Sequence, residues 1–230
     1  QVRRVGQVEA VDGQFVVLAD ENRPGRRPVL PGEAATDVAF EHDPLGAARV
    51  KQRLAGEVPD TVLLLEHEPV ITIGRTPDRS SLLAAEMAGV PVIETNRGGQ
   101  ATYHGPGQLV GYLILDLTSQ GKDLHVHLRS VEQSVIRVCR ELGVAAGRRA
   151  GLTGVWVAER KLASIGVGVR KWITMHGFAL NVTTESLAGF QSIVPCGIQG
   201  VSMTCLDAES DSRFNVDDVA AKYVFPGPAD

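Results

Sequence analysis

The chain has 230 residues, of which 43% are hydrophobic and 22% charged, with a formal net charge of −4 at pH 7. This composition is typical of a globular protein with a substantial core, and the acidic balance argues against nucleic-acid binding, which needs a basic surface. No apolar run approaches the roughly 20 residues that cross a bilayer, and no targeting segment is expected. The three cysteines have different surroundings, so we expect no disulfide framework and a reducing, cytoplasmic compartment.

The first 45 residues carry few clear structural signals. An apolar run at 15–19 predicts a strand, and the prolines and glycine at 23–28 predict a loop. The Asp-Pro pair at 43–44 then supplies an N-cap and a first-turn proline for a helix over 45–55. The short β-branched and apolar runs after it are typical of buried strands. These runs lie at 62–65, 70–73, 92–93 and 109–117.

The clearest helix is expected over 123–142, because apolar residues recur there at steps of three and four and Gly143 supplies a stop. Cys139 lies beside this apolar stripe and is expected in the core. The next expected elements are a hairpin of 154–158 and 161–169, a strand at 175–182, and a helix at 216–224 capped by Asn215. Strands outnumber helices and come in runs, which favours one α+β (α/β) domain over 1–230, with mixed β-sheets flanked by helices.

The densest unusual segment is the glycine-rich block at 97–112, RGGQATYHGPGQLVGY. Its Gly-Pro-Gly at 105–107 resembles a nucleotide loop, but the next glycine comes one residue late and a strand follows where a helix is needed. The chain also lacks a G-x-x-x-x-G-K-[ST] loop. We therefore expect no nucleotide or other cofactor. The glycines either form tight turns between strands or let a ligand approach the backbone closely.

Cys196 lies between a proline and a glycine, in a turn that presents a thiol better than it packs one. The alternative, a small buried hydrophobe, is common for free cysteines. A thiol with a pKa near 8.5 is mostly protonated at neutral pH, so a catalytic Cys196 needs a neighbouring cation or base. Lys161 precedes small residues typical of a pocket wall, although most lysines are solvated surface charges.

His104 and His176 are rival bases for the thiol, because histidine is the commoner partner of a catalytic cysteine. Sequence spacing does not decide between them and Lys161. A metal site is not expected, because the chain has no C-x-x-C motif and His125 and His127 open a helix without a second ligand pair.

Several motifs together resemble those of the bacterial LipB type of lipoyl(octanoyl) transferases. They are the block at 97–112, the runs GVWV at 154–157, KLASIG at 161–166, HGFALN at 176–181 and IVPCGI at 193–198, and LLLEH at 63–67 followed by Gly-Arg at 74–75. The resemblance spans about residues 60–206. It implies the fold of the biotin/lipoate protein ligase catalytic domain.

The resemblance also implies a function. Enzymes of this family move an octanoyl group from octanoyl-acyl carrier protein to a lysine of lipoyl domains, as the first step of endogenous lipoate biosynthesis. By the same resemblance Cys196 carries the acyl thioester, Lys161 is its general acid/base, and His176 shapes the pocket. The substrate-binding residues that it implies are Arg97, Gly98, Gly99, Gln100, Ala101, Thr102, Tyr103, His104, Ser164, Ile165, Gly166, Gly177, Phe178 and Ala179.

The implied acceptors are the lipoyl domains of 2-oxoacid dehydrogenase complexes and the glycine cleavage H protein, and we expect a monomer. Both protein partners are acidic, so basic side chains are candidate docking charges, with ordinary solvated charge as the alternative. The candidates are Arg148, Arg149, Arg160, Arg170 and Lys171. Two other functions stay open: an ATP-dependent ligase of the same fold, which needs no thiol, and a module that only binds carrier or lipoyl domains.

Overall fold

The structure is a computed structural model that describes residues 2–11, 14–18, 44–76, 89–193 and 200–223. Its main element is an eight-stranded antiparallel sheet with the order β2-β1-β3-β7-β11-β10-β9-β8. The bounds of its strands are β1 (Val2–Val11), β2 (Gln14–Leu18), β3 (Thr61–His67), β7 (Gln108–Ile114), β8 (Gly147–Arg149), β9 (Leu152–Val157), β10 (Arg160–Arg170) and β11 (Ile173–Asn181).

A second sheet has three strands in the order β5-β4-β6. Strand β4 (Val70–Ile73) pairs in parallel with β5 (Val92–Glu94) and antiparallel with β6 (Ala101–His104). The two sheets and the helices around them confirm the predicted α+β class with mixed sheets.

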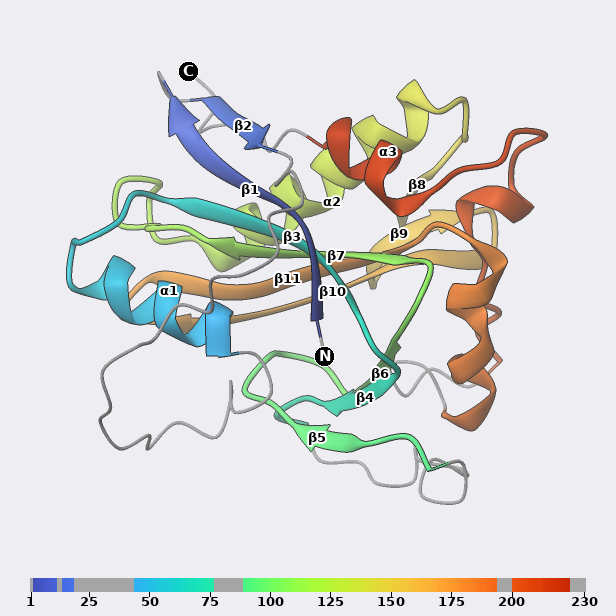
Figure 1. Ribbon diagram of the computed structural model, residues 1–230, viewed down its shortest axis with the longest axis horizontal. Helices are drawn as coiled ribbons and strands as arrows, with labels where there is room; N and C mark the ends of the chain where they lie inside the picture. The colour runs from blue at the N-terminus through green and yellow to red at the C-terminus, as the bar shows by residue number, and fades with distance from the viewer. Residues whose placement is uncertain (1, 12–13, 19–43, 77–88, 194–199, 224–230) are drawn as a thin grey trace, which may run out of the picture.

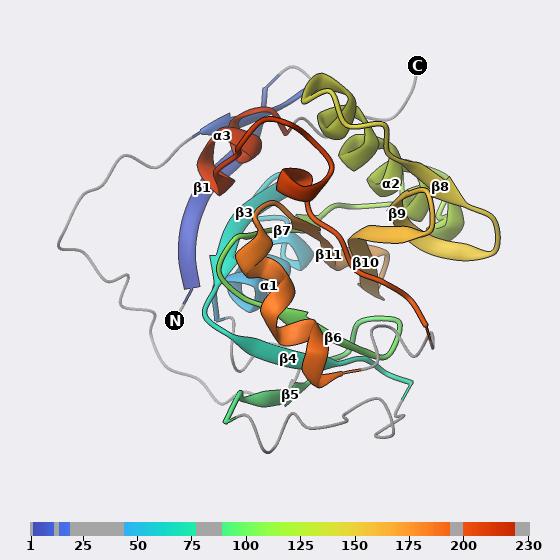
Figure 2. The same cartoon turned by 90° about the vertical axis from the view of Figure 1, so that its right-hand side faces the viewer.

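Other secondary-structure elements pack against both faces of the large sheet (Figures 1 and 2). Helices α2 (Leu124–Glu141) and α3 (Val216–Ala221) lie on one face, while α1 (Pro44–Leu54) and the small sheet lie on the other. The short helices η4 (Thr184–Ser192) and η6 (Leu206–Ala208) follow β11. Because the central strands are covered twice, both sides of β3 are apolar: Val62 and Leu64 pack toward α2, and Leu63 and Leu65 pack toward α1.

Most predicted elements are confirmed within a few residues. Helix α2 begins after Asp123, whose carboxylate accepts hydrogen bonds from the backbone N–H groups of His125 and Val126, and Asn215 caps α3 in the same way through Asp218. Cys139 is fully buried in the core, as expected. The predicted hairpin is β9–β10. The last helix was predicted to end at 224, but α3 ends at Ala221 with Lys222 as its C-cap. The expected loop at 23–28 and the cap at 43 lie outside the described residues.

Strands β1, β6 and β8 are absent from the sequence-based expectation. Strand β6 lies inside the glycine-rich block, for which no strand was predicted, and it pairs with β4 through Tyr103 opposite Ile71 and Ala101 opposite Ile73. Only five residues separate the glycine pairs at 98–99 and 105–107, so the alternation of this short strand was hidden by the glycines on either side.

Candidate active site

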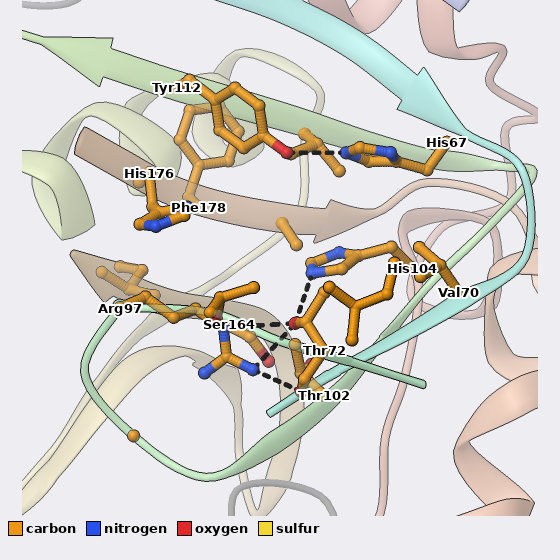
Figure 3. Close-up of a pocket in the computed structure, with 18 of the residues that line it drawn as sticks. His67, Val70, Thr72, Arg97, Thr102, His104, Tyr112, Ser164, His176 and Phe178 are labelled. Atoms are coloured by element: carbon orange, nitrogen blue, oxygen red, sulfur yellow. Dashed lines mark hydrogen bonds between the residues drawn. The ribbon is translucent and has the colours of Figure 1, made fainter. Parts of the chain in front are cut away.

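A cavity of about 410 Å³ lies between the large and the small sheet (Figure 3). Its volume is within the range of about 300–1,000 Å³ that is typical of small-molecule sites. The large sheet forms one wall of the cavity, from residues that lie directly opposite one another on adjacent strands. Gly166, Gly177 and Tyr112 form one row across β10, β11 and β7, and Ser164, Ala179 and Val110 form the next.

Small residues in these rows make room for the cavity and for close backbone contacts. A Cβ atom on Gly177 would lie 2.3 Å from the carbonyl oxygen of Gly111, and one on Gly166 would lie 3.0 Å from that of Gly98. The Gly98 N–H donates to Val167 O at 2.9 Å, which ties the start of the glycine-rich block to β10. The block therefore supplies both a strand and a closely packed loop at the cavity.

His104 lies on the small-sheet side of the cavity, and hydrogen-bond direction determines its tautomer. The carbonyl of Thr204 accepts from Asn181 Nδ2 at 2.9 Å, so Asn181 Oδ1 accepts from Gln108 Nε2 at 2.9 Å. Gln108 Oε1 then faces His104 Nδ1 at 2.8 Å, and this nitrogen is the protonated one. A backbone carbonyl, which only accepts, thus fixes the direction of the whole chain of hydrogen bonds.

The same chain continues on the other side of the ring. His104 Nε2 carries no proton and accepts from Thr72 Oγ1 at 3.3 Å, while Thr72 Oγ1 accepts from Arg97 Nη2 at 2.9 Å (Figure 3). Arg97 Nη2 also donates to the Thr72 carbonyl at 2.7 Å. Burial, with charges of His67 and Arg97 nearby, lowers the pKa of His104 to about 3. Both nitrogens of this neutral ring are therefore engaged in positioning.

Two further histidines border the cavity. His67 Nε2 lies 2.8 Å from Tyr112 Oη, and His176 Nε2 lies 3.0 Å from Asn96 Oδ1. Burial lowers the pKa of His67 to about 4 and that of His176 to about 3. His176 also has a φ of 60°, a left-handed conformation that costs energy for a non-glycine residue within a strand. The strained backbone holds the imidazole at the cavity.

Lys161 is a buried side chain at the cavity, with 2% of its surface exposed, and is not a solvated surface charge. Its backbone N–H donates to Ser202 O and its carbonyl accepts from Thr204 N–H, both at 2.9 Å. Its Nζ lies 5.5 Å from the ring centroid of Trp156, its partner in register on β9. The aromatic face and two backbone hydrogen bonds thus define the position of Lys161.

Most of the predicted site residues meet at this cavity. Those that line it are Lys161, Arg97, Gly98, Gly99, Gln100, Thr102, His104, Ser164, Ile165, Gly166, His176, Gly177, Phe178 and Ala179. Ala101 and Tyr103 are not among the lining residues, because alternation along β6 turns them to its other side, where Tyr103 packs edge-on against Phe190. Cys196 lies outside the described residues.

Sequence reasoning missed several side chains that line the cavity. Thr72, Tyr112 and Thr153 are examples, and His67 was noted only as part of a motif. The signal available for Thr72 was its polar side chain inside the apolar run at 70–73. The described residues contain no group of three or more potential metal ligands, and the absence of a metal site stays a prediction.

The expected docking charges are largely paired within the chain. The pairs are Arg148 with Glu132, Arg149 with Glu159, and Arg160 with Glu209 through two hydrogen bonds. Three of the five candidates therefore have a structural explanation in these pairs. None of the described helices is long and apolar enough to span a membrane.

Comparison with known proteins places the chain among acyl-transferring and ligating enzymes. Residues 45–224 match the family described as "Lipoyl protein ligase A/B catalytic domain". An octanoyltransferase of Geobacter metallireducens is 58% identical over 154 residues, covering 67% of this chain and 70% of the relative. An octanoyltransferase of Geobacter sulfurreducens is 51% identical over 172 residues, covering 75% of this chain and 72% of the relative.

Solved structures with the same fold are far more distant in sequence. The bipartite lipoate protein ligase of Thermoplasma acidophilum superimposes with a TM-score of 0.58 at 18% identity, covering 80% of this chain and 77% of that one. Lipoate-protein ligase A bound with ATP has a TM-score of 0.58 at 18% identity, covering 70% and 68%. These likenesses confirm the predicted lipoate-ligase fold.

Proposed function

Because the chain belongs to the lipoyl protein ligase A/B catalytic-domain family, in its octanoyltransferase branch, we propose that it transfers octanoyl groups from octanoyl-acyl carrier protein to a lysine of lipoyl domains. It is an enzyme of the acyltransferase class. The observation that carries the proposal is the buried amine of Lys161 on the wall of a cavity of about 410 Å³. The octanoyl chain would occupy this cavity between the two sheets.

In the first step, the Cys196 sulfur attacks the carbonyl carbon of the carrier-bound thioester. A new C–S bond to Cys196 forms and the C–S bond to the carrier breaks. Lys161 takes the proton of the Cys196 thiol and delivers it to the departing thiolate of the carrier. Since one thioester replaces another, the step needs no ATP.

In the second step, the amine of the acceptor lysine attacks the Cys196 thioester. A C–N bond forms, the C–S bond breaks, and the proton lost by the amine passes through Lys161 to the Cys196 sulfur. The amide is more stable than the thioester, so this step runs downhill. In each step, Lys161 passes the proton that is released to the sulfur atom that departs.

The described chain on either side of Cys196 supports its pairing with Lys161. Ile193 packs with Ile71 and Tyr103 in the core of the small sheet, and only two residues lie between Ile193 and Cys196 in the sequence. On the other side, Ser202 and Thr204 bond directly to the backbone of Lys161. The assignment of the base to Lys161 rather than His104 is supported by the tautomer, since both ring nitrogens of His104 are engaged.

The proposal also specifies the acceptors, the pathway, the oligomeric state and the substrate-binding residues. The acceptors are the lipoyl domains of 2-oxoacid dehydrogenase complexes and the glycine cleavage H protein, and the reaction is the first step of endogenous lipoate assembly in the cytoplasm. The protein acts as a monomer without a cofactor. We keep all the substrate-binding residues proposed from the sequence. Ala101 and Tyr103 would contribute indirectly, because their side chains lie on the other side of β6.

The test is to incubate the protein with octanoyl-acyl carrier protein without ATP and to measure its mass. We expect a gain of one octanoyl group on Cys196, loss of this adduct in Cys196→Ser, and discharge onto an added lipoyl domain. Lys161→Ala is expected to slow both steps by about 100-fold or more, because proton transfer contributes about 10²–10⁴-fold.

Each other function gives a different result in this experiment. A ligase would need ATP and would remain active as Cys196→Ser, and a binding module would form no adduct at all. Absence of an octanoyl adduct under every condition would rule out the proposal. Turnover of Lys161→Ala at the wild-type rate would rule out the proposed base.

A further inference from the structure

Glu132 is a carboxylate with no exposed surface, in the middle of α2. Its Oε1 accepts from the Gly154 N–H at 3.1 Å, and its Oε2 accepts from Arg148 Nε at 2.9 Å and from Arg129 Nη1 at 2.6 Å. A buried charge is costly unless such partners compensate for it. The carboxylate therefore joins α2 to β8 through Arg148 and to β9 through Gly154.

Gly154 is in direct contact with Lys161. Its φ of +131° is a conformation that side chains rarely adopt, and a Cβ atom there would lie 2.8 Å from Lys161 Cε and 2.7 Å from the carbonyl oxygen of Ala163. No larger residue fits this position without movement. The backbone of Gly154 thus forms a wall against the end of the Lys161 side chain.

The β8–β9 hairpin also carries the aromatic platform of Lys161. Trp156 follows Gly154 by two residues on β9, and its ring faces Nζ of Lys161. The hairpin is the outer edge of the large sheet, and such edges open more readily than central strands. Arg148 Nη2 adds bonds to Arg129 O and Gln133 Oε1 on α2, so the attachment of the hairpin to the helix centres on Glu132.

We infer that Glu132 is a positioning residue for Lys161, which acts through the backbone of Gly154 and the β8–β9 hairpin. The inference rests on the proposed role of Lys161 as the acid/base of acyl transfer. A displacement of about 1 Å at a reacting group lowers a rate by about 100-fold. Loosening the hairpin should therefore reduce catalysis although Glu132 touches no reacting atom.

The experiment compares four variants. Glu132→Gln keeps an oxygen acceptor for Gly154 but loses the charge that holds Arg148, Glu132→Ala loses both, and Gly154→Ala pushes directly on Lys161. We expect kcat to fall by about 10-fold in Glu132→Gln and about 100-fold in the other two, with KM for the octanoyl donor changed by less than about threefold. Gly151→Ala is the matched control, because Gly151 has a φ of +75° in the same hairpin but open space around its Cβ, and we expect a change below about twofold.

A double-mutant cycle separates positioning from general destabilisation. In the Lys161→Ala background, Glu132→Gln should have no further effect on the rate if it acts through Lys161. An equal fractional loss in both backgrounds, or a folded Glu132→Gln with wild-type kcat, would overturn the inference.

A second measurement does not depend on catalysis. The rate at which a small amine-reactive reagent labels Lys161, followed by peptide mass spectrometry, should rise several-fold in Glu132→Gln and Gly154→Ala and stay constant in Gly151→Ala. Unchanged labelling in all variants would refute the positioning role. If labelling changes while the wild type forms no octanoyl adduct, the positioning holds and the proposed function fails.

Discussion

At the scale of single residues, the site is determined by hydrogen-bond direction. His104 is one of the residues implied by the motif, but its role as an orienting group follows only from partners far apart in sequence. Gln108, Asn181 and Thr204 fix one ring nitrogen, and Thr72 occupies the other. No spacing rule brings these residues together, so the sequence left His104 open as a base.

Four histidines with lowered pKa values predict a specific dependence of stability on pH. Burial lowers the pKa of His67 and His127 to about 4 and of His104 and His176 to about 3, from 6.5. Above pH 6.5 both folded and unfolded chains carry neutral rings. Below pH 6.5 the histidines bind protons in the unfolded chain but stay neutral in the folded chain. The free energy of unfolding therefore falls as the pH falls from about 6.5 toward 4, by up to about 1.4 kcal/mol per pH unit for each histidine.

The measurement is the unfolding temperature between about pH 7.5 and pH 4.5, by calorimetry. His104→Gln should reduce the slope below pH 6.5 relative to the wild type. A flat profile across this range would contradict the prediction.

At the scale of elements, the central strands require glycine for packing rather than for turns. Gly111 on β7 lies opposite Phe178 on β11, and the phenyl ring crosses over it and packs against Tyr223 at a centroid distance of 4.8 Å. The strand at 109–117 was predicted from its apolar run, but this pairing depends on strand order. Gly111 was expected inside this strand, but its position beneath an aromatic ring was not foreseen.

Gly111→Ala is expected to lower the free energy of unfolding by about 1–3 kcal/mol, because overpacking forces side chains and backbone to move. The new Cβ would lie 2.1 Å from Phe178 Cε1, and Tyr223 blocks the ring from moving away. Denaturant titration measures the effect. Gly147→Ala is the control, since its Cβ would meet nothing within 4 Å, and Phe178→Leu should recover part of the loss in the Gly111→Ala background. Equal stability of the two glycine variants would contradict this account.

At the scale of the whole molecule, the cavity exists because a small sheet packs over one face of a large one. Ala179 lies in its wall between Ser164 and Val110 and is buried in the core shared with α1. The size of this side chain therefore sets the local depth of the cavity. The extent of the domain over 1–230 stays a prediction.

If the acyl chain occupies this cavity, Ala179→Val should shift the preference toward shorter chains. We expect the ratio of kcat/KM for octanoyl over butanoyl donors to fall by about 10-fold, since one methylene in an apolar pocket is worth about 10–200-fold in discrimination. The butanoyl donor is the internal control for folding and catalysis. An unchanged ratio, with both rates lowered equally, would place the acyl chain elsewhere.

The sequence by itself determined the local elements and the identity of the family motifs. The apolar periodicity of α2, its Asp123 cap and the β-branched runs of β3 and β4 are properties of neighbouring residues, so they can be read along the chain. The tertiary structure decided which side of each strand meets the cavity and which distant groups meet each other. Ala101 and Tyr103 turned away from the cavity, and Glu132 came to hold Gly154 against Lys161, because strand register and helix packing join residues that no sequence spacing connects.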